Sequence, residues 1–119
     1  MVVLSLFDGM SCGMLALKRA GIQVDSYFAS EIDKYAVQVS KKNWSEIIHI
    51  GDVTQVKYKD GVLQTQFGSC KTKIDMVIGG SPCTSFSVAG DGSGFDGESG
   101  LFFEYLRILR EVNPKYFLL

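Results

Sequence analysis

The sequence is poor in the residues that bind metals. It has one histidine, His49, and three widely spaced cysteines, Cys12, Cys70 and Cys83, without a Cys-x-x-Cys pair or a Cys/His cluster. We therefore predict no metal site. His49 lies in an apolar segment, which favours a structural role over a Cys–His hydrolase pair. An odd number of cysteines without a secretory leader is typical of a reducing compartment, so we expect a cytoplasmic protein, or a nuclear one in a eukaryote.

Long apolar runs and a strong charge of one sign are also missing. No segment approaches the roughly 20 apolar residues that a membrane helix requires, so we expect no membrane partner. The net charge of -1 argues against non-specific attraction to a polyanion, although a nucleic acid could still bind through another region. The remaining composition, 46% hydrophobic and 21% charged over 119 residues, is typical of one globular domain.

Apolar and helix-forming segments alternate along the chain. We expect strands at residues 2–7, 24–30, 47–50, 74–78 and from 116 onward, and helices at 14–21, 34–43 and 101–112. Strands that alternate with helices indicate βαβ units, and therefore an α/β fold with a parallel sheet and flanking helices. Residues 54–73 have the least regular pattern. We expect a helix-poor connection there with a small hairpin, and turns at Asp60-Gly61 and Phe67-Gly68.

Residues recur at helical spacing in two of the expected helices. In helix 34–43, one face carries Tyr35, Ala36 and Val39, and Lys42 extends it. Asn113-Pro114 should end helix 101–112, since a residue before proline disfavours helical geometry. The stripe of this last helix, which we expect in the core, consists of Phe102, Tyr105, Leu106, Leu109 and Val112.

An acidic residue follows each of the first three expected strands: Asp8, Glu31 and Asp52. Ligands of parallel sheets bind beyond the carboxyl ends of the strands, so these side chains should share one edge. Each carboxylate alone is equally compatible with a helix cap or a solvated loop, but their recurrence favours a cofactor site. The loop Gly9-x-x-x-Gly13 lacks the Gly-x-Gly-x-x-Gly pattern, and an acid beside the first helix would repel a pyrophosphate. Glu31 could accept hydrogen bonds from ribose hydroxyls and Asp52 from an adenine amino group. S-adenosylmethionine, a cationic adenosine derivative, fits this set.

Cys83 lies in a polar, glycine-rich loop after the fourth expected strand. The loop begins with Gly-Gly-Ser-Pro-Cys at residues 79–83, and residues 79–100 contain more than half of the chain's 13 glycines. A thiol at such a ligand edge is a candidate nucleophile. Cys12 and Cys70 are interpreted instead as small buried hydrophobic residues.

In this order, the motifs resemble those of the DNA (cytosine-5) methyltransferases, over essentially all 119 residues. Residues 6–13, Leu-Phe-Asp-Gly-Met-Ser-Cys-Gly, are similar to the first family motif, the cofactor loop. The later motifs are matched by Glu31-Ile32-Asp33, by Gly51-Asp52-Val53, by the Pro-Cys segment 79–87 and by Gly-Leu-Phe-Phe-Glu at 100–104. Residues 10–12 and Thr84 differ from the residues that are commonest at these motif positions in bacterial members of the family. Leu-Phe-Phe-Glu is more similar to the motif of the eukaryotic de novo branch.

The resemblance implies a Rossmann-like methyltransferase fold that uses S-adenosylmethionine and transfers its methyl group to carbon 5 of cytosine in double-stranded DNA. The target cytosine would be flipped out of the duplex and attacked at carbon 6 by Cys83, forming a covalent adduct. Pro82 would fix the backbone beside the nucleophile. Ser85 and Ser87 would lie in a loop that closes on DNA.

The resemblance also implies a set of cofactor-binding residues. Phe7 would pack on the cofactor, and Leu101 would close its adenine or methionine side. The full set is Phe7, Asp8, Gly9, Met10, Ser11, Gly13, Glu31, Ile32, Asp52, Val53, Pro82 and Leu101.

Several later family motifs are absent: the Glu-Asn-Val motif that holds the cytosine, the Arg-x-Arg motif and the target-recognition domain. We therefore expect residues 1–119 to be the amino-terminal part of the catalytic domain, truncated after about the fifth strand. Such a fragment should be inactive alone, expose an apolar strand edge and need the carboxy-terminal part as its partner. The alternatives are another nucleotide-dependent Rossmann-type enzyme and a non-catalytic binding or regulatory module. Restriction-modification, phage self-modification and epigenetic marking are equally compatible with the resemblance.

Overall fold

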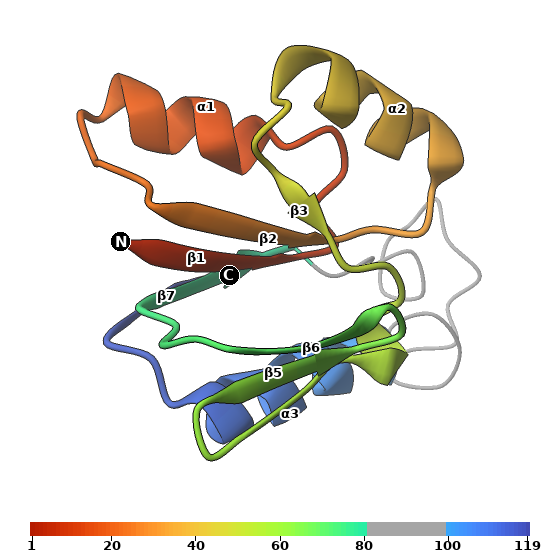
Figure 1. Cartoon of the computed structure of the whole chain (residues 1–119), viewed down its shortest axis with the longest axis vertical. Helices are drawn as coiled ribbons and strands as arrows, with labels where there is room; N and C mark the ends of the chain where they lie inside the picture. The colour runs from red at the N-terminus through yellow and green to blue at the C-terminus, as the bar shows by residue number, and fades with distance from the viewer. Residues whose placement is uncertain (81–99) are drawn as a thin grey trace, which may run out of the picture.

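A five-stranded parallel sheet crosses the middle of the molecule in the computed structural model, which describes residues 1–80 and 100–119 (Figure 1). Its strands are β1 (Val2–Leu6), β2 (Ser26–Ser30), β3 (Ile48–His49), β7 (Met76–Gly79) and β8 (Tyr116–Leu118), in the order β3-β2-β1-β7-β8. The chain builds outward from β1 to β3 and then crosses to β7 and β8 on the other side. The strand order therefore reverses between β1 and β7, the place where open α/β sheets bind ligands.

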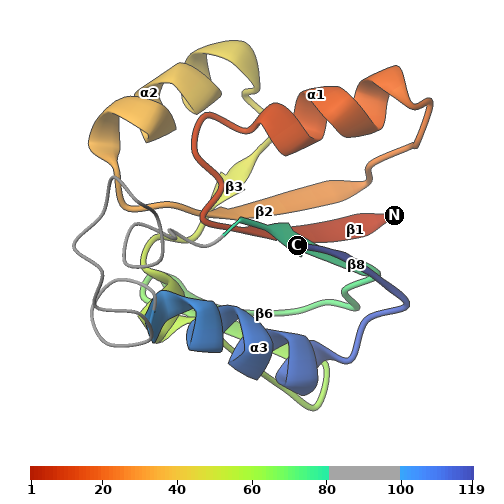
Figure 2. The same cartoon turned by 180° about the vertical axis from the view of Figure 1, so that it is seen from behind.

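Helices cover both faces of the sheet, which confirms the expected α/β architecture. Helices α1 (Cys12–Arg19) and α2 (Lys34–Asn43) lie on one face, and α3 (Leu101–Val112) lies on the other (Figures 1 and 2). Alternate residues of β1 point to opposite faces, as the strand period requires. Val3 packs beneath α1 with Met14 and Leu17, whereas Leu4 and Leu6 pack on the α3 side with Tyr105 and Ile108.

Residues 54–73 form more structure than the small hairpin that we expected. A short 3-10 helix, η1 (Val53–Gln55), leads into an antiparallel sheet of β4 (Lys57–Lys59), β5 (Val62–Thr65) and β6 (Gly68–Lys71). Asp60 and Gly61 both have positive φ, 52° and 76°, and they join β4 to β5 as a two-residue turn. This confirms the predicted turn. The small sheet lies beside α3 on the lower face of the main sheet (Figure 1).

Helices α2 and α3 have the predicted bounds, and the predicted core stripe of α3 is confirmed in part. In α2 the face that carries Tyr35 and Val39 is largely exposed, at 67% and 42%, whereas Ser40 is fully buried. In α3 the most buried residues are Tyr105 and Ile108, and the second of these lies outside the predicted stripe. Leu101, Leu109 and Val112 are partly buried and pack beside them. Phe102 and Leu106 are also partly buried but do not belong to this core cluster. A short helix fits several apolar stripes, and packing against the sheet selects one of them.

Strand β8 lies at the edge of the main sheet and pairs in parallel with β7. Phe117, Leu118 and Leu119 are 62%, 65% and 59% exposed. This confirms the expected apolar strand edge. In residues 1–80 and 100–119, the helices are too short and too polar to cross a membrane.

Candidate functional site

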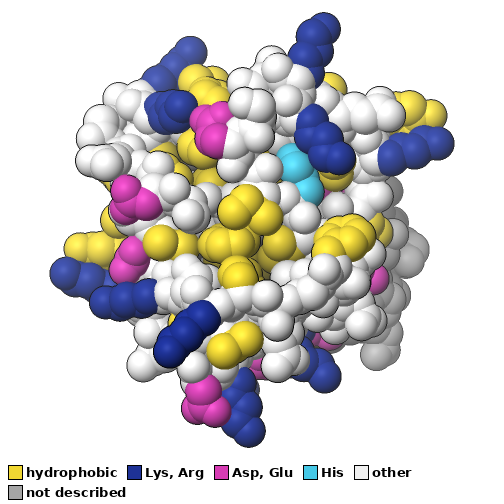
Figure 3. Space-filling view, in the orientation of Figure 1, with side chains coloured by type: hydrophobic (Ala, Val, Ile, Leu, Met, Phe, Trp, Pro, Cys, Tyr) yellow, Lys and Arg dark blue, Asp and Glu magenta, His cyan; other side chains and the backbone are white. Residues whose placement is uncertain are grey.

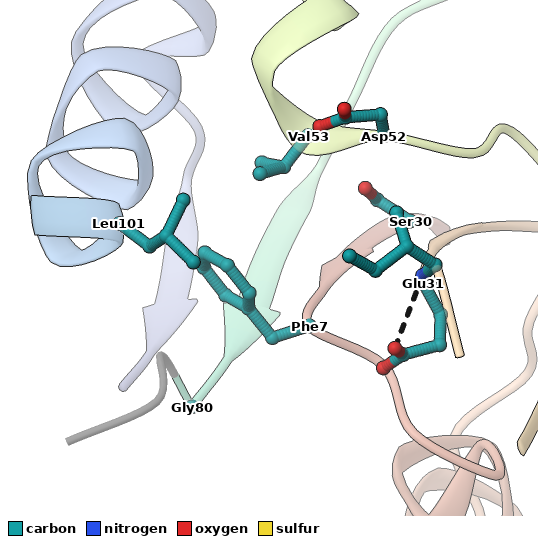
Figure 4. A pocket seen from close by; sticks show the side chains of 8 residues that line it. Phe7, Ser30, Glu31, Asp52, Val53, Gly80 and Leu101 are labelled. Atoms are coloured by element: carbon teal, nitrogen blue, oxygen red, sulfur yellow. Dashed lines mark hydrogen bonds between the residues drawn. The ribbon is translucent and has the colours of Figure 1, made fainter. Parts of the chain in front are cut away.

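The loops that follow β1, β2 and β3 meet the start of α3 around one cavity of about 250 Å³ (Figure 4). The cavity lies at the carboxyl edge of the sheet, beside the strand-order switch. It brings together six of the twelve predicted cofactor residues. Its lining is formed by Phe7, Ser30, Glu31, Ile32, Asp52, Val53, Gly80 and Leu101. Ser30 and Gly80 were not predicted as site residues, although each stands at the end of a buried strand.

Phe7 forms the apolar wall of this cavity. Its backbone has a φ of 54°, a left-handed conformation that is rare and strained for a bulky side chain. This turn ends β1 and directs the ring toward Leu101 of α3 (Figure 4). Strained residues of this kind cluster at ligand sites. Phe7 and Leu101 therefore offer a flat apolar surface to a ligand, with Asp52 and Val53 on another wall.

A second hollow, of about 360 Å³, shares Phe7 and Gly80 with the first. Its lining also includes Ser5, Leu6, Asp8, Gly13, Ile78, Gly79, Leu118 and Leu119. Together the two hollows run along the carboxyl edge from β3 to β8. Their described lining residues include Asp8, Glu31 and Asp52 but neither lysine nor arginine. Such a cleft is electrostatically suited to a cationic or zwitterionic ligand, and unsuited to a pyrophosphate.

The carboxylate of Asp8 is the centre of a hydrogen-bond network within the fold. One oxygen accepts hydrogen bonds from Ser5 Oγ and from Tyr27 OH, both at 2.6 Å, and the other accepts one from Ser11 Oγ. Burial and then the charge of Asp8 raise the pKa of Tyr27, so the phenol stays protonated and donates. Ser11 is also 2.5 Å from Ser40 Oγ of α2. Asp8 therefore holds the loop after β1 against α2 and the sheet, a role that its position in the sequence did not reveal.

Glu31 ties the loops after β1 and β2 together. Its Oε1 accepts a hydrogen bond from the backbone N–H of Gly9 at 2.7 Å. Its Oε2 accepts from the N–H groups of Ile32 and Asp33, both at 3.0 Å, and the first of these bonds is the dashed line in Figure 4. A carboxylate has about four acceptor positions, so one position remains for a ligand hydroxyl.

Asp52 has a free oxygen among the described residues. Its Oδ1 caps η1 by accepting from Thr54 N at 2.9 Å and Thr54 Oγ1 at 2.8 Å. Its Oδ2 has no partner in residues 1–80 or 100–119, and the side chain lines the cavity. The backbone N–H of Asp52 donates to Gln66 Oε1 at 2.7 Å. Ser30 Oγ donates to the carbonyl of Gly51 at 2.8 Å on the other side of this loop.

Not all of the remaining predicted residues line the cleft. Met10 and Ser11 line a separate hollow on the helical side, next to Trp44. Gly13 lets α1 approach the sheet, because a Cβ there would lie 2.7 Å from Ile78 Cδ1 and 2.8 Å from Tyr27 OH. Pro82, Cys83, Ser85 and Ser87 lie outside the described residues.

Cys12 and Cys70 are both exposed, so the expectation that they are buried is wrong. Cys12 begins α1 on its outer side, and Cys70 lies on the outer strand of the small sheet. Within residues 1–80 and 100–119, no group of three or more His, Cys, Asp or Glu side chains lies close enough to hold a metal ion.

Comparison with known proteins identifies the family. The family model described as C-5 cytosine-specific DNA methylase matches residues 1–119. The chain belongs to this family. This confirms the resemblance drawn from the motifs.

Several methyltransferases align with nearly all of the chain. The orphan methyltransferase M.Rho11sI of Bacillus phage rho11s is 38% identical over 98% of this chain and 22% of its own length. The type II methyltransferases M1.ScrFI of Lactococcus lactis subsp. cremoris and M.NgoPII of Neisseria gonorrhoeae are 39% and 37% identical, over 98% and 99% of this chain. The chain spans 27% and 32% of their lengths, and so less than a third of each of these relatives.

A solved structure supports the fold independently. A candidate RNA methyltransferase from Pyrococcus horikoshii superposes with a TM-score of 0.52 at 20% identity, covering 90% of this chain and 45% of that one. At this identity the likeness concerns the fold alone. It confirms the Rossmann-like methyltransferase fold expected for a DNA methylase.

Proposed function

We propose that this chain provides the cofactor site and the nucleophile of a DNA methyltransferase that transfers a methyl group from S-adenosylmethionine to carbon 5 of cytosine. The observation that carries the proposal is the acidic cleft at the carboxyl edge of the sheet, in a chain of the DNA methylase family. A DNA substrate would place the enzyme in the cytoplasm, or in the nucleus of a eukaryotic cell.

The two hollows fit the two ends of S-adenosylmethionine. We assign the adenosine end to the cavity of Figure 4, where Phe7 and Leu101 offer apolar contact. The remaining acceptor position of Glu31 suits a ribose hydroxyl, and the free Oδ2 of Asp52 suits the adenine amino group. The amino-acid end would extend past Gly80 into the second hollow, where the negative charge of Asp8 favours an ammonium group. When bound, the cofactor supplies an electrophilic methyl group on a sulfonium.

Cys83 is the proposed nucleophile for the cytosine. Its thiolate would add to carbon 6 of the flipped base, which makes carbon 5 nucleophilic enough to take the methyl group. A base would then remove the proton from carbon 5, and the thiolate would leave as the ring double bond reforms. Pro82 would restrict the backbone beside the thiol, and Ser85 and Ser87 would contact the DNA.

The partner is proposed to be a further part of the same enzyme. The relatives are more than three times as long as the segment that aligns, so they contain regions without a counterpart in these 119 residues. We assign cytosine holding, recognition of the DNA sequence and the covering of β8 to such a region. Alone, residues 1–119 should bind cofactor but methylate DNA little or not at all.

Covalent trapping tests this function. DNA that contains 5-fluorocytosine keeps the enzyme attached after methyl transfer. Carbon 5 then carries fluorine in place of the proton that the base must remove, so the thiolate cannot be eliminated. The chain, supplied with a complementing region, should form an adduct that resists denaturation and depends on S-adenosylmethionine. Cys83→Ser should abolish the adduct. Cys12→Ser is the matched control, since Cys12 is exposed and should leave trapping unchanged. An adduct that survives Cys83→Ser would contradict the proposal.

A further inference from the structure

Gln66, in the small antiparallel sheet, contacts the loop that carries Asp52. It lies in the two-residue turn between β5 and β6, where Thr65 pairs with Gly68. Its Oε1 accepts a hydrogen bond from the backbone N–H of Asp52 at 2.7 Å. Gln66 does not itself line the cavity, whereas Asp52 and Val53 do.

The loop after β3 is shaped to receive this side chain. Gly51 has a φ of 80°, and a Cβ added there would lie 2.4 Å from Gln66 Oε1 and 2.5 Å from its Cδ. Only glycine allows both the left-handed backbone and this close approach. On the opposite side, Ser30 Oγ donates to the carbonyl of Gly51 at 2.8 Å. The loop is therefore held between a strand of the main sheet and a turn of the small sheet.

The β5–β6 hairpin is anchored firmly enough to position Gln66. Leu63 of β5 is fully buried in the core beneath the main sheet. Thr65 Oγ1 accepts from Phe67 N at 3.1 Å and donates to the carbonyl of Gly68 at 3.0 Å, which braces the turn. Figure 3 shows apolar side chains gathered where the hairpin faces β3, along a groove lined in part by Ile48 and Phe67. The turn therefore stays next to the loop after β3.

We propose that Gln66 is a positioning residue of the cofactor site, which fixes the backbone of Asp52 so that its free Oδ2 faces the adenine amino group. This inference rests on the proposed function. The hydrogen bond is exposed to solvent, so water can replace it in the unliganded protein and the cost to folding is small. Ligand binding needs one defined position of Asp52, so losing the bond should reduce affinity more than stability.

The test compares Gln66→Met with wild type. Methionine keeps the length of the side chain and removes the acceptor. Gln64→Met is the matched control, because Gln64 is exposed on the same hairpin and its side chain has no partner among the described residues. Calorimetric titration measures the Kd of S-adenosylmethionine and of S-inosylmethionine, in which a carbonyl replaces the adenine amino group. Thermal unfolding of each variant gives the change in folding stability.

Gln66→Met should raise the Kd of S-adenosylmethionine about 3- to 10-fold, and so bring it closer to the Kd of S-inosylmethionine. The Tm of the variant should change by less than about 2 °C. Gln64→Met should change none of these values. An unchanged Kd and preference in Gln66→Met would overturn this inference and leave the proposed function intact. An equal rise in the Kd of both ligands, together with a large fall in Tm, would show that Gln66 has a structural role. That result would also overturn this inference. Failure of wild type to bind S-adenosylmethionine would refute the proposed function itself.

Discussion

Replacing Gly79 with alanine would force two central strands of the sheet apart. Gly79 ends β7 and pairs with Leu6 of β1. A Cβ at Gly79 would lie 2.4 Å from the carbonyl oxygen of Leu6, and 3.2 Å from its carbonyl carbon and Cβ. The shortest of these contacts is about 1 Å inside ordinary van der Waals distance. Because the obstructing atom belongs to the backbone of a buried strand, no side-chain rotation can relieve it.

The magnitude follows from two opposing effects. Overpacking a core costs about 1–3 kcal/mol, and a clash with backbone belongs at the upper end of that range. Alanine also lowers the conformational entropy of the unfolded chain, which returns about 0.4–1 kcal/mol. The first effect is larger, so Gly79→Ala should lower the free energy of unfolding by roughly 2 kcal/mol.

The neighbouring glycine provides the control. A Cβ at Gly80 would have no atom within 4 Å among the described residues, so Gly80→Ala should change the free energy of unfolding by less than about 0.5 kcal/mol. Urea unfolding, followed by the fluorescence of Trp44, the single tryptophan, measures both variants. A Gly79→Ala protein as stable as wild type, or an equal loss in Gly80→Ala, would refute the reasoning.

Three further outcomes are expected from the structure. Tyr27→Phe removes the hydrogen bond to Asp8 and should cost about 1–2 kcal/mol at pH 7 in urea unfolding. Burial raises the pKa of Tyr27 above its ordinary value of 10.0. Wild type should therefore lose stability relative to Tyr27→Phe as the pH rises above 10.0. A stability difference between the two proteins that stays constant with pH would contradict a raised pKa of Tyr27. Burial lowers the pKa of His49, so the unfolded chain takes up a proton first and stability should fall as the pH drops below 6.5; a His49→Gln protein with the same pH dependence would contradict this. Gly51→Ala should displace Gln66, so its effect on cofactor affinity and that of Gln66→Met should be less than additive; full additivity in calorimetry would contradict the contact.

Local signals made much of the fold predictable. Helix α2 begins where the Asp33 side chain accepts from the N–H groups of Tyr35 and Ala36, and α3 ends at Asn113, with a φ of 47°, before a proline. The turn at Asp60-Gly61 was predictable because its dipeptide suits two positive φ values. These features depend on neighbours in sequence, which is why the bounds of both helices were correct.

The parts that were not predictable depend on contacts between distant segments. Nothing in the sequence near Gln66 indicates that it meets Asp52, 14 residues earlier, because the meeting depends on how the hairpin folds back. The inward face of α2 depends on the sheet beneath it, so the burial of Ser40 and the exposure of Tyr35 and Val39 were not predictable from the helix alone. It was predictable from topology that the acidic residues lie at one edge of the sheet. The hydrogen bonds that Asp8 makes inside the fold were not predictable.

Equilibrium titration with S-adenosylmethionine and NAD tests most directly whether the acidic cleft is a methyl-donor site. The protein should bind S-adenosylmethionine and bind NAD far more weakly, because the cleft has carboxylates and no described basic residue to meet a pyrophosphate. Asp52→Asn should weaken S-adenosylmethionine binding about tenfold, since a hydrogen bond to a charged acceptor is lost. Asp60→Asn is the control: it changes a residue in a turn away from the cleft and should leave S-adenosylmethionine binding unchanged. Tighter binding of NAD, or equal binding by wild type and Asp52→Asn, would contradict this assignment.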